Sequence, residues 1–172
     1  MRLILRDMNW AVAAAMAEAF ADCPQVIVSH GDIRAVTADA IVSPANSYGY
    51  MCGGIDLVYR MTFGVWIERA VQARIERLHG GELPVGEATA VETLHPDVPL
   101  MIVAPTMRTP GPLPVGSLNA YLALRAALKL AAERGVRQLL CPGMCTLTGR
   151  MAPGEAARQM RLAYGEHAGL PV

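Results

Sequence analysis

The strongest constraint on the fold is the alternation, along the whole chain, of short apolar strands with longer amphipathic segments. Six runs rich in β-branched or apolar residues are typical of strands, at residues 3–5, 26–28, 40–42, 88–91, 100–104 and 138–141. Helical spacing of apolar residues follows in between, at 12–20, 67–78, 117–134 and from residue 153 onward. Several strands are apolar throughout, as in a sheet covered on both faces. We therefore predict a three-layer α/β/α sandwich with a mixed, largely parallel central sheet.

Local signals mark where these helices begin and end. Asn9 is a plausible N-cap for the first helix, and Gly135 is a suitable stop for the third. Pro153 suits the first turn of the last helix, because a proline there loses no intrahelical hydrogen bond. The size of 172 residues, without a linker or internal repeat, predicts a single domain covering 1–172.

Composition narrows the class of protein. Hydrophobic residues make up 53% of the chain and charged residues 17%, a globular composition. The apolar stretch at 10–20 is alanine-rich, contains Glu18 and is too short to cross a bilayer, so no membrane association is expected. The N-terminus lacks a convincing signal-peptide cleavage site, and we expect a cytoplasmic protein.

Charge and cysteine content argue against other classes of partner. Fifteen basic and fifteen acidic residues balance, so binding to duplex nucleic acid is not expected. A small anionic ligand remains possible, because backbone amides can hold phosphate. The four cysteines are too few and too irregular for a disulfide framework, and Cys141 and Cys145 lack a second pair of metal ligands. Neither a metal nor another cofactor is predicted.

Turn-forming residues are concentrated in three loops where strands end and helices begin, which is where open α/β sheets bind ligands. In the first loop, His30-Gly31-Asp32-Ile33, Asp32 can accept a hydrogen bond from an exocyclic amine such as that of adenine. The alternative is a solvated aspartate in a tight turn.

The second loop, at 43–56, contains three glycines that would let backbone N–H groups approach a phosphate. Asn46 can donate and accept hydrogen bonds to ribose hydroxyls. Asp56 either caps the following helix or polarises a water molecule. For the glycines the alternative is a flexible turn, and Cys52 is better explained as an apolar thiol than as a nucleophile, because no histidine is identifiable as its partner.

The third loop, at 142–151, combines two threonines, two glycines and an oncoming helix N-terminus, which suits a phosphate. It lacks the Gly-Lys-Ser/Thr ending of nucleoside triphosphatases, so triphosphate hydrolysis is disfavoured.

Taken together, these motifs resemble the macrodomain family. Residues 38–46, ADAIVSPAN, resemble the family's VDAIVNAAN run, and Asp56, ten residues after Asn46 and preceded by Gly-Gly-Ile, matches the Asp of its GGGVD stretch. Residues 30–33 resemble the family's GDI loop, and residues 142–151 its second phosphate loop. The chain is most similar to a bacterial and phage-associated subgroup with SPANSFGFMDGGID and APTMR motifs, matched here at 43–56 and 104–108.

The resemblance implies a cleft for ADP-ribose or an ADP-ribosylated molecule. In it, Asp32 would bind the adenine amine, Asn46 would contact the distal ribose, and Asp56 would activate a water molecule to hydrolyse an ADP-ribosyl ester. Tyr48 and Tyr50 would either cover the distal end or anchor the loop. The implied ligand-binding residues are Asp32, Ile33, Ser43, Ala45, Asn46, Tyr48, Tyr50, Cys52, Gly53, Gly54, Ile55, Cys145, Thr146, Leu147, Thr148, Gly149, Arg150 and Met151.

Four residues of these loops depart from the family pattern: Ser43, Cys52, Cys145 and Leu147. Where relatives have glycine, a side chain can block a phosphate or oppose a left-handed backbone conformation. The alternative to an enzyme is therefore a non-catalytic ADP-ribose reader, or a phage-derived accessory domain with weakened binding.

Overall fold

The computed structural model describes residues 1–170 and contains all six expected strands. The expected domain bounds of 1–172 include residues 171–172, which lie outside the described part. The elements are β1 (Arg2–Asp7), α1 (Trp10–Ala19), β2 (Val26–His30), the short 3₁₀ helix η1 (Ile33–Ala35), β3 (Ala40–Ser43), α2 (Gly54–Phe63), α3 (Trp66–His79), β4 (Thr89–Glu92), β5 (Leu100–Val103), α4 (Asn119–Glu133), β6 (Gln138–Cys141) and α5 (Pro153–Ala168).

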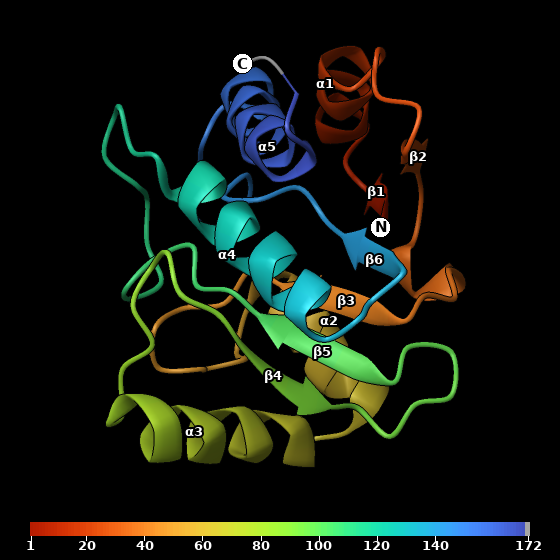
Figure 1. Cartoon of the computed structure of the whole chain (residues 1–172). Coiled ribbons are helices and arrows are strands. Elements are labelled where there is room, and N and C mark those ends of the chain that lie inside the picture. Colours follow the sequence, from red (N-terminus) through yellow and green to blue (C-terminus); the bar gives the residue numbers. More distant parts are fainter. Residues whose placement is uncertain (171–172) are drawn as a thin grey trace.

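The strands form one mixed sheet in the order β2-β1-β6-β3-β5-β4. Every neighbouring pair is parallel except β4 and β5, which run antiparallel at one edge. Figure 1 shows α4 in front of the sheet and α2 behind it, with α1 and α5 above. The predicted three-layer α/β/α sandwich is therefore confirmed.

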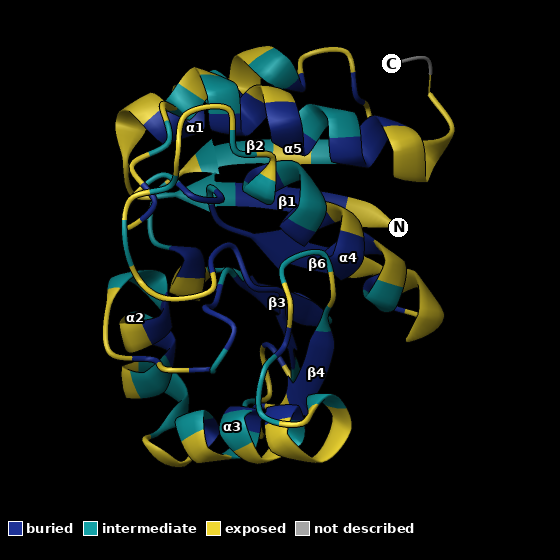
Figure 2. Cartoon of the chain, turned by 90° about the vertical axis from the view of Figure 1, so that its left-hand side faces the viewer, coloured by how far each residue is buried: buried dark blue, intermediate teal, exposed yellow. Residues whose placement is uncertain are grey.

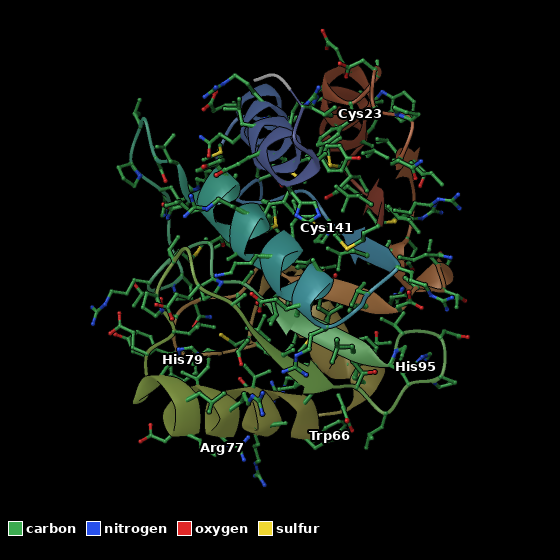
Figure 3. The ribbon with its side chains drawn as sticks, in the orientation of Figure 1. Cys23, Trp66, Arg77, His79, His95 and Cys141 are labelled. Atoms are coloured by element: carbon green, nitrogen blue, oxygen red, sulfur yellow. The ribbon has the colours of Figure 1, made fainter. Side chains whose placement is uncertain are left out.

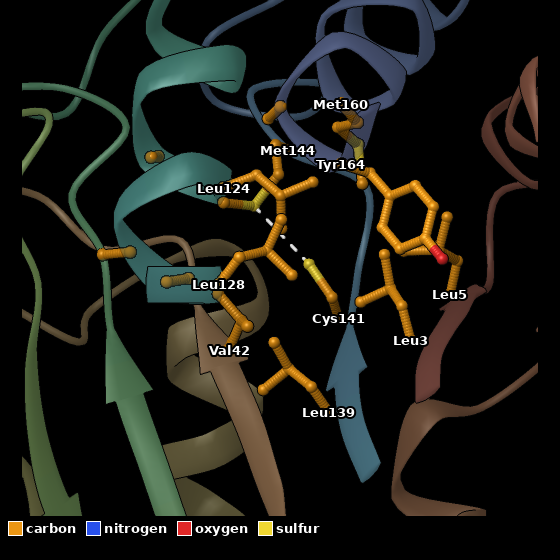
Figure 4. Packing of buried hydrophobic residues seen from close by; sticks show 14 of the residues in the cluster. Leu3, Leu5, Val42, Leu124, Leu128, Leu139, Cys141, Met144, Met160 and Tyr164 are labelled. Atoms are coloured by element: carbon orange, nitrogen blue, oxygen red, sulfur yellow. Dashed lines mark hydrogen bonds between the residues drawn. The ribbon is translucent and has the colours of Figure 1, made fainter. Parts of the chain in front are cut away.

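Alternation along the strands produces the two covered faces of the sheet. In β1, Leu3 and Leu5 belong to the apolar cluster under α1, α4 and α5, whereas Ile4 belongs to the cluster under α2 and α3. Figure 4 shows Leu3, Leu5 and neighbouring core residues on the first face. The edge strand β2 is only partly buried, whereas Figure 2 shows β3 and β6 as largely buried. Burial on both sides explains why these strands are apolar throughout.

The helix limits agree with most of the local signals. The Asn9 side chain accepts a hydrogen bond from the Ala11 backbone N–H at 2.9 Å, as an N-cap does. Gly135, with φ 69°, follows the end of α4, and Pro153 is the first residue of α5. The third helix begins two residues later than expected, at Asn119, because the Ser117 hydroxyl accepts from the Asn119 N–H in a turn before the helix.

The parallel strands end at the same edge of the sheet, so the segments that follow them meet there. β6 lies between β1 and β3, which places the segment after residue 141 between those after residues 7 and 43. Asp7 at the end of β1 and Asn9 just after it thereby lie at this edge, beside the three loops at 30–33, 43–56 and 142–151. Within residues 1–170, no helix is long and apolar enough to span a membrane.

Candidate functional site

A cavity of about 670 Å³ opens at this edge of the sheet, a size typical of small-molecule sites. Segments after β1, β2, β3, β5 and β6 all line it. Of the residues expected at a ligand site, those in the lining are Asp32, Ile33, Ala45, Asn46, Tyr50, Cys52, Gly53, Gly54, Ile55, Asp56, Cys145, Thr146, Leu147, Thr148 and Gly149. The tertiary structure thus brings the three loops together around one space.

Asp32 lines the cavity and already has a charged partner. Its carboxylate caps η1 by accepting from the Arg34 N–H at 2.9 Å, and Arg34 Nη2 donates to Oδ2 at 2.6 Å. The pKa of Asp32 is lowered, chiefly by the side-chain hydrogen bond from Arg34. Arg6 also contacts this turn, because its Nε donates to the Asp32 carbonyl oxygen at 2.9 Å. The aspartate is therefore charged and partly neutralised by a neighbour that the sequence analysis did not single out.

Asn46 holds the second loop in shape. Its carboxamide oxygen accepts from the backbone N–H groups of Tyr48 and Tyr50, both at 3.2 Å, and its Nδ2 donates to the Tyr50 carbonyl oxygen at 2.7 Å. The side chain is 5% exposed. An amide has two acceptor sites and two N–H donors, so one N–H remains for a ligand.

Asp56 lies in the first turn of α2, where it lines the cavity while remaining 7% exposed. Gly53, not Asp56, occupies the N-cap position, so the capping alternative does not describe this residue. The Ser43 hydroxyl donates to Asp56 Oδ1 at 2.6 Å. Burial raises the pKa of Asp56 to about 6, while the hydrogen bond from Ser43 acts to lower it. A carboxylate with this pKa can accept a proton near neutral pH.

The second and third loops meet at Gly54, where a left-handed backbone conformation favours glycine. Gly54 has φ 59°, and a Cβ built there would lie 3.6 Å from Thr148 Oγ1 and 3.8 Å from Leu147 Cδ2. Leu147 is 71% exposed, and its side chain lies beside Gly54. It therefore occupies space beside the glycines that were expected to approach a phosphate.

Two residues of the third loop, Cys145 and Arg150, have left-handed backbone conformations although neither is glycine. Cys145 has φ 65° and is 5% exposed, so its thiol packs inward while the backbone takes the conformation that glycine favours. Leu147 is not among the residues with positive φ, so the expected backbone conflict falls on Cys145 instead. Gly149 closes the loop tightly, because a Cβ there would lie 2.6 Å from the Cys145 carbonyl oxygen.

Several backbone N–H groups of the third loop are free. The N–H groups of residues 146–149 make no hydrogen bond within the described part of the chain. The N-terminal N–H groups of α2 also lack intrahelical partners, as at every helix start. Two sets of unused backbone donors thus lie around the same cavity, an arrangement suited to an anion.

Four expected residues do not line the cavity. Ser43 contacts Asp56 from the end of β3, and Arg150 and Met151 are the last residues of the third loop, before α5. Tyr48 points elsewhere: its hydroxyl donates to Glu82 at 3.1 Å, and the Arg108 guanidinium lies 5.5 Å from its ring centre. Of the two alternatives for the tyrosines, Tyr48 is a loop anchor and Tyr50 lines the cavity.

Several lining residues were not among the expected site residues. They are Arg6, Asp7, Met8, Asn9, Arg34, Pro44, Val58, Thr106, Met107, Pro110, Pro142 and Gly143. The first four lie at the end of β1 and directly after it, but this signal is useful only once β1 is known to lie inside the sheet. Met107 forms an isolated parallel bridge with Asn46, which extends the β3–β5 pairing into the loops.

The exposed Cys52 thiol has no histidine partner in the lining. His79 pairs with Glu87 at 3.2 Å, and the His95 ring packs edge-on against Phe63 at 5.8 Å. Figure 3 labels both histidines in the lower part of the molecule. Within residues 1–170, no group of three or more His, Cys, Asp or Glu side chains is placed to hold a metal ion.

Known proteins resemble this chain in sequence and in fold. The sequence model of the Macro domain family matches residues 42–160 of this chain. An uncharacterized protein of Aeropyrum pernix is 35% identical over 136 residues, covering 79% of this chain and 68% of that protein. The O-acetyl-ADP-ribose deacetylase of Enterobacter cloacae subsp. cloacae is 31% identical over 128 residues, covering 72% and 67%.

Among solved structures, Thermosipho africanus DarTG in complex with ADP-ribose matches with a TM-score of 0.66 at 15% identity. This match covers 83% of the present chain and 39% of that one, and it shows the shared fold. The family match spans the second and third loops and Asp56. With its mixed six-stranded sheet and its relatives above 30% identity, the chain belongs to the Macro domain family.

Proposed function

We propose that this chain binds ADP-ribose, or the ADP-ribosyl group of a larger molecule, in the cavity and hydrolyses an ADP-ribosyl ester. The observation that carries the proposal is Asp56, a buried carboxylate that lines the cavity beside unused backbone N–H donors. The deacetylase name of the Enterobacter cloacae relative supports an ester of this kind as the substrate.

The loops offer a different chemical environment to each part of the ligand. Asp32 in the cavity lining can accept a hydrogen bond from the adenine amine. The free N–H groups of residues 146–149 and of the α2 N-terminus suit the diphosphate. The remaining N–H of Asn46 can donate to a hydroxyl of the distal ribose, near Asp56.

Ester hydrolysis at this site needs a base for water and a fixed substrate. Asp56 takes a proton from a water molecule, whose oxygen bonds to the acyl carbon. The ester C–O bond then breaks, the leaving ribose oxygen takes the proton back from Asp56, and the acyl group is released as a carboxylate. Because Asn46 orders the loop and backbone dipoles hold the diphosphate, positioning supplies much of the rate enhancement.

A non-catalytic reader is the second candidate function, and Leu147 favours it. Its side chain occupies space beside Gly54, where a diphosphate would approach the backbone. A reader needs only binding, which a partly occupied cleft can still provide at reduced affinity.

Two measurements test the proposal and separate it from the reader. Calorimetric titration with ADP-ribose, beside AMP, ADP and ATP, should show binding that favours ADP-ribose. Incubation with O-acetyl-ADP-ribose, followed by chromatography, should then show release of ADP-ribose. Binding without release would favour the reader, and absence of binding would reject both functions.

Four finer assignments accompany the proposal. We place the chain in the bacterial and phage-associated subgroup on its motifs at residues 43–56 and 104–108. We take 1–172 as one domain and the cytoplasm as its location. Balanced charge supports a small ligand or an ADP-ribosylated molecule as the partner, without duplex nucleic acid.

A further inference from the structure

The contact between Ser43 and Asp56 joins a rigid strand to the carboxylate at the cavity. Ser43 is the last residue of β3 and is 1% exposed. Its position is fixed from the β5 side, because it pairs with Val103 of β5 and its carbonyl oxygen accepts from the Ala104 N–H at 3.0 Å. The hydroxyl that reaches Asp56 therefore comes from a well-anchored part of the sheet.

The two carboxylate oxygens of Asp56 have different surroundings. Oδ1 accepts from the Ser43 hydroxyl at 2.6 Å. Oδ2 has no hydrogen-bond partner within residues 1–170. Solvent can still reach this oxygen. Since Asp56 lines the cavity, the free oxygen is the one available to a water molecule or a ligand there.

The nearby arginines are paired elsewhere: Arg60, one turn further along α2, pairs with Glu68 at 3.1 Å, and Arg6 and Arg34 of the cavity lining contact Asp32. On α2, Tyr59 donates its hydroxyl to the Val42 carbonyl oxygen at 3.2 Å. Across the sheet lie Cys141 on β6 and Asp7 on β1, while Cys52 and Cys145 line the cavity from the second and third loops. The Ser43 hydroxyl is thus the side-chain donor that stabilises the charged form of Asp56.

We propose that Ser43 is a positioning residue for Asp56: its hydroxyl fixes one carboxylate oxygen, keeps the group charged, and presents the other oxygen to the cavity. The inference rests on the proposed function, in which Asp56 is the base. Ser43 itself does not touch the ligand, because it lies outside the cavity lining. Ser43, which departs from the family pattern, is thereby given the role of positioning Asp56.

The test compares Ser43→Thr with Ser43→Val. These two side chains have nearly the same shape, so any cost of the added bulk is shared, while threonine alone keeps the hydroxyl. We expect the acidic limb of the pH–rate profile for O-acetyl-ADP-ribose hydrolysis to lie about one pH unit higher in Ser43→Val than in Ser43→Thr. The kcat should fall in the valine variant, with KM similar in the two.

A second readout does not depend on activity. In protein labelled with ¹³C at the aspartate carboxyl carbons, the Asp56 resonance is identified by its absence in Asp56→Asn and followed against pH. A higher Asp56 pKa in Ser43→Val than in Ser43→Thr supports the inference, and equal pKa values overturn it. If the wild-type protein releases no ADP-ribose, hydrolysis is rejected while this comparison still decides whether Ser43 controls Asp56.

Discussion

Arg34 holds the carboxylate of Asp32 in a two-point ion pair at the edge of the cavity, with Nε 3.0 Å from both oxygens and Nη2 2.6 Å from Oδ2. An adenine amine that approaches Asp32 therefore shares the carboxylate with a guanidinium. Arg34 itself lines the cavity, so the pair belongs to the surface that a ligand meets.

Replacement of Asp32 by Ala should weaken ADP-ribose binding by about 1.5–3 kcal/mol, the range for a hydrogen bond to a charged group. Asp32→Asn is the matched control, because its amide oxygen can still cap η1 and accept a hydrogen bond. Calorimetric titration measures both variants. Unchanged affinity in Asp32→Ala would show that Asp32 serves only its own turn and Arg34.

Replacement of Asp56 by Ala should slow the release of ADP-ribose from O-acetyl-ADP-ribose by about 100-fold or more, as expected for loss of a general base. Affinity should change little, since lost transition-state assistance lowers kcat more than binding. Steady-state kinetics measures the fall in kcat, and calorimetric titration with the product, ADP-ribose, measures the affinity. Equal turnover by wild type and variant would remove Asp56 from the mechanism.

The burial of Asp56 also makes a prediction for stability against pH. Its pKa is raised from 3.8 to about 6 on folding, so the native state binds the extra proton between those values. Its contribution to stability is present below about pH 4 and is lost as pH rises through about 6, an effect of about 3 kcal/mol.

Asp56→Asn, which carries no charge at any pH, should therefore gain stability relative to wild type as pH rises from about 4 to 7. Urea unfolding at several pH values measures the difference. Asp97→Asn, at an exposed site away from the cavity, is the control and should show no such trend. A constant difference between Asp56→Asn and wild type across this range would mean that the carboxyl titrates normally.

Shortening Leu147 should open the cleft. We expect wild-type affinity for ADP-ribose in the micromolar to millimolar range, which corresponds to about 4–8 kcal/mol. Leu147→Gly should tighten binding, because its side chain lies beside Gly54, and addition of Cys145→Gly should relieve the positive φ at that residue.

Leu118→Ala provides a control for loss of an exposed leucine outside the cavity. Calorimetry would contradict our explanation if the wild-type protein bound with nanomolar affinity. The explanation would also be contradicted if the double variant of Leu147→Gly and Cys145→Gly bound ADP-ribose no better than wild type. The third loop of the wild-type protein would then already leave the diphosphate position open.

Addition of a methyl group at Gly149 should damage the third loop. Its Cβ would lie 2.6 Å from the Cys145 carbonyl oxygen, so Gly149→Ala should destabilise the protein by about 1–3 kcal/mol through overpacking. Gly154→Ala, in the first turn of α5 with no heavy atom within 4 Å of the added Cβ, should be neutral or stabilise by up to about 1 kcal/mol. Thermal unfolding distinguishes the two, and equal melting temperatures would show that the loop yields without cost.

The local sequence determined the strands and the helix limits of this protein. The six apolar runs, the Asn9 cap and the stop at Gly135 were predictable, because hydrophobic periodicity and capping act over a few neighbouring residues. Apolar residues on both faces of the strands also predicted the layered fold, since such strands must be covered twice. The three loops could be identified from their position after strands.

The tertiary structure alone decided which other residues join these loops and how their side chains are paired. Arg6 and Asn9 reach the cavity because β1 lies between β2 and β6, an order set by long-range packing that no local pattern records. Tyr48 turns toward Glu82, 34 residues away in sequence, and Ser43 meets Asp56 across the sheet–helix boundary. Hydrogen bonds and ion pairs depend on distances of a few ångströms, which the chain defines only after its distant segments have packed together.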